Sequence, residues 1–125
     1  YNCALNPLGA ILGVHYGAVG QSGETRMIMD QVIGETFSVI AAMGGSTPWP
    51  DAAAYRKVFY GDLIPATSNH RASMLQDLDH HKPTEVEAMV GYVAAQGKKY
   101  GVPTPACDFL AALVRFKQEQ GLAQA

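Results

Sequence analysis

The 125-residue sequence predicts an all-α domain of about six helices, and three observations support this prediction. Apolar residues recur at spacings of three and four along most of the chain, as in helices that bury one face. β-Branched alternation long enough for a strand is absent. Glycine and proline clusters separate the periodic segments, as expected at helix ends. At this length we expect one domain, residues 1–125.

The opening stretch YNCALNPLGAILGVHYG is predicted to start within a helix, with Tyr1 already helical. Asn2 and Asn6 lie one helical turn apart, so both amides project to the same side. Asparagine is a poor helix former, and a pair on an apolar segment therefore needs an explanation. Either one amide caps a helix and the other is exposed, or both bind hydroxyl or carboxylate oxygens of a ligand.

The longest helix is predicted over residues 24–43, where a broad apolar stripe is typical of a core helix. The stripe consists of Met27, Ile28, Val32, Ile33, Phe37, Ile40 and Ala41. Gly44 and Gly45 end this helix, because glycine adopts the left-handed conformation without a Cβ penalty. A proline-containing loop over 44–51 follows, and a short helix is predicted over 51–60.

A second long loop is expected over residues 60–70, and long loops in compact domains usually serve function. One short helix is predicted within RASMLQDLDHH (71–81), and another over 83–101, with acids in its first turn and lysines in its last. The last helix is predicted over 105–120. Its apolar face consists of Phe109, Leu110, Leu113, Val114 and Phe116.

Charge and composition exclude several classes of protein. A net charge of −2 argues against a nucleic-acid or membrane-surface module, and no apolar run approaches the roughly 20 residues of a membrane span. Cys3 and Cys107 sit among apolar neighbours without zinc-ligand spacing. We therefore expect buried thiols in a soluble protein of a reducing compartment, the cytoplasm.

Two further residues could bind a ligand. Ser73 immediately precedes a helical MLQD run. Either its hydroxyl and the nearby backbone N–H groups bind an anion, or Ser73 is simply the N-cap of that helix. Glu85 is either a surface acid favoured by the helix dipole or a carboxylate turned towards a polar ligand. No metal site is expected from Asp77, Asp79 and the adjacent His80–His81 pair, because adjacent histidines diverge and no matched ligand set lies elsewhere.

Taken together, four stretches resemble the C-terminal domain of the ketopantoate reductase (2-dehydropantoate 2-reductase) family. They are NCALNPLGAILG, MIMDQVIGETFSVIAAMG, SMLQDLDHHKPTEVEAMVGYVAAQGKKYGVPTP and the helix that follows. The third is the most specific. The resemblance implies a helical domain like that of 6-phosphogluconate dehydrogenase, preceded by a Rossmann domain that binds NADPH and lies outside this chain. The active site would lie between the two domains.

The resemblance also implies an activity, the reduction of ketopantoate to (R)-pantoate for pantothenate and coenzyme A synthesis. Asn2, Asn6 and Ser73 match residues that bind substrate in the family. Glu85 matches a glutamate beside the substrate and the nicotinamide end of the cofactor. The family's general-acid lysine would fall three residues upstream of Tyr1, so this chain is expected to be inactive alone.

The sequence departs from the family pattern just before the serine. Family members often carry Asn three residues before it and a second Ser directly ahead, whereas this chain has His70 and Ala72, with Asn69 adjacent. His70 therefore counts among the substrate-binding candidates. Two alternatives stay open: a related reductase of another small 2-oxo acid, and a free-standing helical interaction or dimerisation module. A homodimer is also left open.

Overall fold

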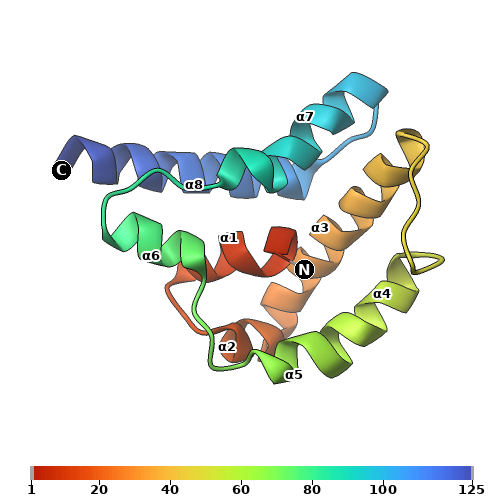
Figure 1. Cartoon of the computed structure of the whole chain (residues 1–125), viewed down its shortest axis with the longest axis horizontal. Coiled ribbons are helices and arrows are strands. Elements are labelled where there is room, and N and C mark those ends of the chain that lie inside the picture. Colours follow the sequence, from red (N-terminus) through yellow and green to blue (C-terminus); the bar gives the residue numbers. More distant parts are fainter. Residues whose placement is uncertain (1, 125) are drawn as a thin grey trace.

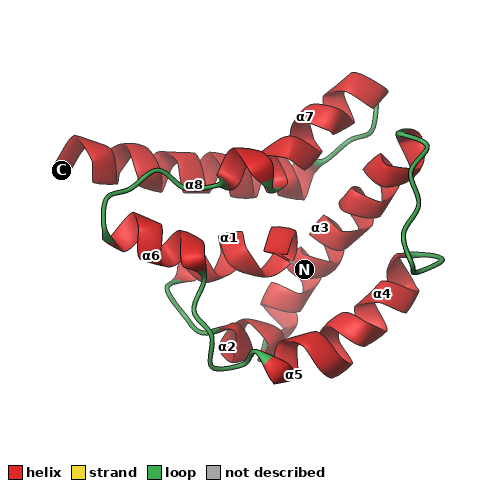
Figure 2. Cartoon of the chain, viewed as in Figure 1, coloured by secondary structure: helices red, strands yellow, loops and turns green. Residues whose placement is uncertain are grey.

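The computed structural model describes residues 2–124, with side chains described for residues 4–121, and the described chain contains helices, turns and loops without a strand (Figure 2). The all-α prediction is therefore confirmed. The elements are α1 (Asn2–Leu12), α2 (Tyr16–Gln21), α3 (Gly23–Ala42), α4 (Ala52–Val58), a π-helix (Phe59–Leu63), α5 (Ile64–Ala66), α6 (Ser73–Asp79), a 3-10 helix (Val86–Ala88), α7 (Val90–Tyr100) and α8 (Pro105–Gln124).

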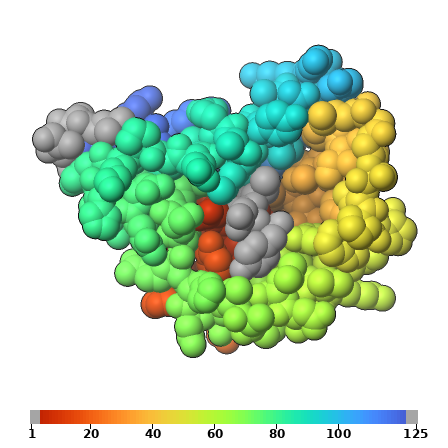
Figure 3. Space-filling view, viewed as in Figure 1, coloured from red at the N-terminus to blue at the C-terminus, as the bar shows by residue number. Residues whose placement is uncertain are grey.

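The hydrophobic core surrounds α1, which lies at the centre of the molecule (Figure 1) and packs against α3, α6 and α8. In the space-filling view α1 is seen only in a gap between later segments of the chain (Figure 3). Helices α7 and α8 pair on one side, and α4 packs against α3 on the other. The buried apolar side chains of α1 and α3 are Ala4, Leu5, Pro7, Leu8, Ala10, Met29, Val32, Ile33 and Val39.

The bounds of α3 agree with the sequence prediction to one residue. Gly44 ends the helix at a φ of 76°, and the N–H groups of Gly44 and Gly45 donate to the carbonyls of Ala41 and Ile40 at 3.0 and 2.9 Å. This is the Schellman arrangement that a terminal glycine permits. The predicted core stripe is partly wrong, because Met27 is 63% exposed and Met29 is buried instead.

The loop predicted over residues 60–70 is largely helical. The chain continues from α4 through the π-helix into α5, so only residues 67–72 connect to α6. Pro65 lies in the first turn of α5, where its missing N–H costs little. The Tyr60 hydroxyl donates to Asp30 Oδ1 of α3 at 2.6 Å. Burial of the Tyr60 side chain raises the pKa of its phenol, and the neighbouring Asp30 carboxylate raises this pKa further.

The helix predicted over 83–101 begins later than predicted. The N–H and the hydroxyl of Thr84 both donate to Gln118 Oε1, at 2.7 and 2.9 Å, so this residue is held by α8 instead of opening a helix. Glu85 precedes the 3-10 helix, and α7 starts at Val90. The end of α7 is as predicted, with Gly101 at a φ of 74°.

Helix α8 starts where predicted and continues to Gln124. Its inner face is buried, and Cys107 is fully buried there as expected; the Cys3 side chain lies outside the described residues. Three residues of the predicted apolar face, Phe109, Leu113 and Phe116, are exposed. That part of the prediction is wrong, because the apolar residues of α8 form two faces and the core covers one.

Candidate functional site

A small polar cavity lies where α1, α6 and the segment before α7 meet. Its volume is about 160 Å³, and its lining consists of Asn6, Ser73, Met74, Asp77, Glu85 and Met89. A larger hollow of about 320 Å³ is bounded mainly by α3, with aromatic walls from Phe37, Trp49 and Tyr55. We regard the smaller cavity as the candidate site, because polar groups that can orient a ligand converge there.

The amide of Asn6 is buried and ties three segments together. Its Oδ1 accepts from the Met74 N–H at 3.3 Å, and its Nδ2 donates to Ser73 Oγ at 3.2 Å and approaches Met89 Sδ at 3.7 Å. A backbone N–H can only donate, so the Met74 contact fixes which end of the amide is oxygen. The side chain is 3% exposed, and its partners within the protein occupy both of its N–H groups.

The hydroxyl of Ser73 faces the cavity. Ser73 is the first residue of α6, and the N-cap position belongs to Ala72, so the interpretation of Ser73 as an N-cap is wrong. Since Ser73 Oγ accepts from Asn6, its own hydrogen is free to point elsewhere. The residue is exposed and lines the cavity, so this hydrogen can be donated to an oxygen of a bound molecule.

Two carboxylates give the cavity an acidic wall. Asp77 lies one turn after Ser73 on α6, and Glu85 lies at the opposite edge. Within the described lining there is no cationic side chain. An anionic ligand would therefore need a positive group from outside these residues. Asp77 was not predicted as a site residue, although its four-residue spacing from Ser73 places both on one face of a helix.

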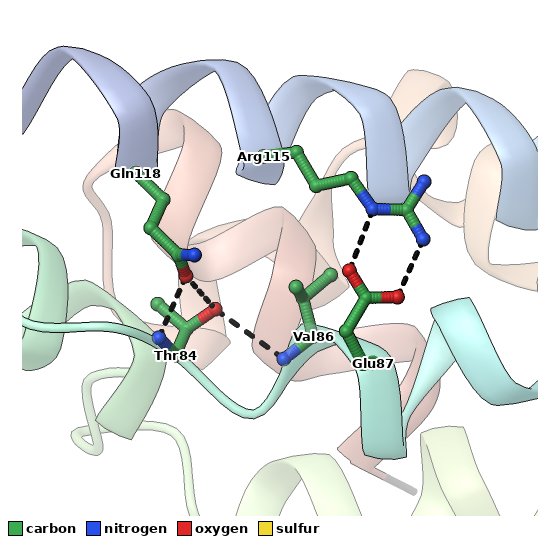
Figure 4. Close-up of polar contacts among 5 residues, drawn as sticks. All are labelled: Thr84, Val86, Glu87, Arg115 and Gln118. Atoms are coloured by element: carbon green, nitrogen blue, oxygen red, sulfur yellow. Dashed lines mark hydrogen bonds and ion pairs between the residues drawn. The ribbon is translucent and has the colours of Figure 1, made fainter.

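The segment that carries Glu85 is clamped to α8 on both sides (Figure 4). Thr84 binds Gln118 as described above, and Arg115 donates from Nε and Nη2 to the two carboxylate oxygens of Glu87 at 2.7 and 2.6 Å. The hydrogen bonds from Arg115 lower the pKa of Glu87, and the same contact raises the pKa of Arg115. These contacts fix the backbone on either side of Glu85, whose own carboxylate is exposed at the cavity edge.

The structure thus brings three of the five predicted site residues, Asn6, Ser73 and Glu85, to one cavity. His70 is exposed and is not part of the lining; its carbonyl accepts from the N–H of Tyr16 at 3.0 Å. The side chain of Asn2 lies outside the described residues. Among the described side chains, no group of three or more His, Cys, Asp or Glu residues is placed to hold a metal ion. No helix in the described part of the chain is long and apolar enough to cross a membrane.

Comparison with known proteins gives one consistent family. Residues 1–118 match the family described as "Ketopantoate reductase PanE/ApbA C terminal". The chain is 45% identical over 118 residues to a 2-dehydropantoate 2-reductase of Aquifex aeolicus, covering 94% of this chain and 38% of the relative. It is 36% identical over 104 residues to a 2-dehydropantoate 2-reductase of Vibrio cholerae, covering 83% of this chain and 33% of the relative. The chain therefore spans well under half the length of these relatives.

Solved structures show the same helical arrangement. A ketopantoate reductase of Ralstonia eutropha superimposes with a TM-score of 0.86 at 30% identity, over 97% of this chain and 39% of that one. The ternary structure of D-mandelate dehydrogenase with NADH and anilino(oxo)acetate gives a TM-score of 0.81 at 30% identity, over 96% of this chain and 49% of that one. The fold is thus that of the C-terminal domain of ketopantoate reductases.

Proposed function

The chain belongs to the ketopantoate reductase family as its C-terminal domain, and from this membership we propose that it is the substrate-binding part of a reductase that converts ketopantoate to (R)-pantoate. The remainder would be an N-terminal Rossmann domain of the same polypeptide that binds NADPH. The pathway would be pantothenate and coenzyme A synthesis, in the cytoplasm. The observation that carries the proposal is the cavity in which Asn6 holds Ser73 ready to donate a hydrogen bond.

The cavity suits a small oxo acid in size and in hydrogen bonding. Its volume of about 160 Å³ equals the space of roughly five water molecules. Ser73 supplies a donor for a carboxylate or hydroxyl oxygen, and the apolar Met74 and Met89 offer contact to a short carbon chain. Holding the substrate in one orientation lowers the entropic part of the barrier without requiring a titratable group.

The acidic wall supports a role for the lysine that the resemblance places three residues upstream of Tyr1. A substrate carboxylate beside Asp77 and Glu85 would be repelled unless a cation lies near it. A lysine eight residues before Asn6, about two helical turns away, would supply one positive charge. The same group could give a proton to the oxygen that becomes the hydroxyl of the product.

Among the residues of this chain, Glu85 is the one placed to contact a dinucleotide cofactor. Glu85 is exposed at the cavity edge with its backbone clamped, so it can meet a group that arrives from outside this domain. The sequence holds no glycine-rich turn that could cradle the phosphates, which the Rossmann domain would have to bind. When bound, the cofactor supplies the hydride. Glu85 would orient the reacting end.

A second candidate is a reductase of another small 2-oxo acid. The likeness to D-mandelate dehydrogenase, which was solved with NADH and an oxoacetate compound, favours this alternative at the same level of identity. His70 and Ala72 also stand where the family often has Asn and Ser. The choice of substrate and of NADPH over NADH is thus the finer part of the proposal.

The test joins this chain to the N-terminal part of the Aquifex aeolicus relative and follows oxidation of NADPH or NADH with ketopantoate and with other 2-oxo acids. We expect turnover with ketopantoate, and none from the 125-residue chain alone. Ser73→Ala should raise KM by about 10- to 100-fold, the value of one hydrogen bond to a charged group. Ser38→Ala, on an exposed face of α3, is the matched control. A folded fusion in which Ser73→Ala keeps the wild-type KM would contradict the site assignment.

A further inference from the structure

Met89 closes one side of the cavity with a flexible apolar side chain. The residue lies between the 3-10 helix and α7, and its Sδ is 3.7 Å from Nδ2 of Asn6 on α1. The side chain is partly buried and packs against the hydrophobic core. Because methionine is unbranched, it fills irregular gaps well, and here it fills the space between these two elements beside the cavity.

The backbone of Met89 is held independently of its side chain. The Met89 N–H donates to the carbonyl of Val86 at 3.2 Å, and the Met89 carbonyl accepts from the N–H of Val93 at 3.2 Å. Two residues earlier, Arg115 holds Glu87 against α8 (Figure 4). A substitution at position 89 should therefore leave the chain in place and change only the space beside Asn6.

The other side chains of the described lining are constrained in different ways. Asn6 and Ser73 hydrogen-bond each other at 3.2 Å, so neither can be shortened without a loss of polar contacts. Met74 is 2% exposed, so its side chain belongs to the core, and the two carboxylates determine the charge of the wall. Met89 has neither a charge nor a strong hydrogen bond, since a thioether is only a weak acceptor. Its length therefore determines the size of the cavity more directly than any other side chain of that lining.

Resting on the proposed function, we propose that Met89 limits the size of the substrate. The site takes 2-oxo acids with a short branched aliphatic chain, such as ketopantoate, and rejects those that carry an aromatic ring. Phenylpyruvate has a benzyl group in place of that chain and would need the space that Cγ, Sδ and Cε of Met89 occupy. The thioether cannot retreat easily, because Asn6 and the core pack against it, and an overfilled site is strained. Met89→Ala removes these atoms and admits the ring.

The test uses the fusion with the N-terminal part of the Aquifex aeolicus relative and compares kcat/KM for ketopantoate with kcat/KM for phenylpyruvate. Wild type is expected to prefer ketopantoate. Met89→Ala should shift the ratio towards phenylpyruvate by at least about 10-fold, the effect of one or more methylene groups in an apolar pocket. Met89→Leu keeps the bulk and should keep the ratio. Met43→Ala is the matched control, because Met43 is exposed directly after α3 and outside the described lining.

Binding is followed separately from turnover, through isotope-labelled methionine methyl groups in the nuclear magnetic resonance spectrum of the fusion. The Met89 signal is identified by its absence in Met89→Leu, and ketopantoate should shift this signal but not that of Met43. A shift without turnover would refute the proposed reductase and not the size limit, for which Met89→Ala must then still strengthen binding of phenylpyruvate relative to ketopantoate. An unshifted Met89 signal, or equal ratios in Met89→Ala and Met43→Ala, would overturn the size limit even in an active fusion.

Discussion

Glu35 is predicted to be the side chain whose loss most weakens the position of α8. It lies in the middle of α3 and is 5% exposed. Its Oε1 accepts from the N–H of Cys107 and its Oε2 from the N–H of Ala106, each at 2.9 Å. These two N–H groups belong to the first turn of α8, where no helical carbonyl is available to them. A carboxylate from one helix thus caps the N-terminus of another, and the helix dipole favours its charge.

The size of the effect follows from these contacts. Glu35→Ala leaves one buried N–H group, of Cys107, and one partly buried N–H group, of Ala106, without an acceptor, at about 1–3 kcal/mol each. Removing a buried carboxylate also relieves its desolvation cost, so the net loss should be about 2–4 kcal/mol. Glu35→Gln keeps one acceptor oxygen but turns an NH₂ group towards the other N–H, and about half that loss is expected.

The assay is urea unfolding of the chain, followed by far-ultraviolet circular dichroism, with Glu119→Ala on the exposed side of α8 as the control. The expected order of stability is control, then Glu35→Gln, then Glu35→Ala. A Glu35→Ala variant within about 0.5 kcal/mol of wild type would refute the reasoning, because a surface substitution has that effect. Hydrogen exchange at Ala106 and Cys107 should accelerate in the same order.

Two further predictions concern the clamp and the packing of α7. Because Arg115 lowers the pKa of Glu87, their contact stabilises the fold above the ordinary carboxyl pKa of 4.5 and is lost as pH falls through the lowered value. Glu87→Gln should therefore lower the free energy of unfolding near pH 6 by less than about 1 kcal/mol, because the pair is exposed, and this loss should shrink as the pH falls below 4.5. A loss that does not change with pH would contradict this. A Cβ at Gly97 would lie 2.7 Å from Thr104 Cγ2, whereas one at Gly34 meets nothing within 4 Å. Gly97→Ala should cost about 1–3 kcal/mol and Gly34→Ala should gain about 0.5–1 kcal/mol in the same assay, and a gain from both would count against this packing.

The sequence predicted the helices whose ends carry local signals. Glycine at 44 and at 101 ends α3 and α7 through its own conformational freedom, and no tertiary contact is needed to see it. The predicted helix bounds are wrong where a contact with a residue distant in the sequence determines the local structure. Gly61 and Pro65 are residues that usually end helices, yet Gly61 lies within the π-helix and Pro65 lies within α5. Thr84 looks like the start of a helix, but Gln118 binds it from 34 residues away.

The candidate site was predictable only through the family resemblance. Spacing could suggest Asn6 and Ser73 one at a time, but their hydrogen bond joins residues 67 positions apart in the chain. The family resemblance predicted Asn6, Ser73 and Glu85 as site residues, and all three line one cavity. It also predicted His70 as a site residue, but His70 is not part of the cavity lining. Asp77 was weighed only as a metal ligand, and that role was rejected, so its place in the cavity wall was missed.

Helix α8 connects the buried carboxylate of Glu35 to the segment that carries Glu85. Its N-terminus is fixed by Glu35, and its middle holds the Glu85 segment through Arg115 and Gln118. Both contacts are thus made by one rigid helix. A well-packed helix shifts as a unit rather than deforming continuously. Loss of the Glu35 contacts at the start of α8 would therefore also disturb the position of the segment that carries Glu85.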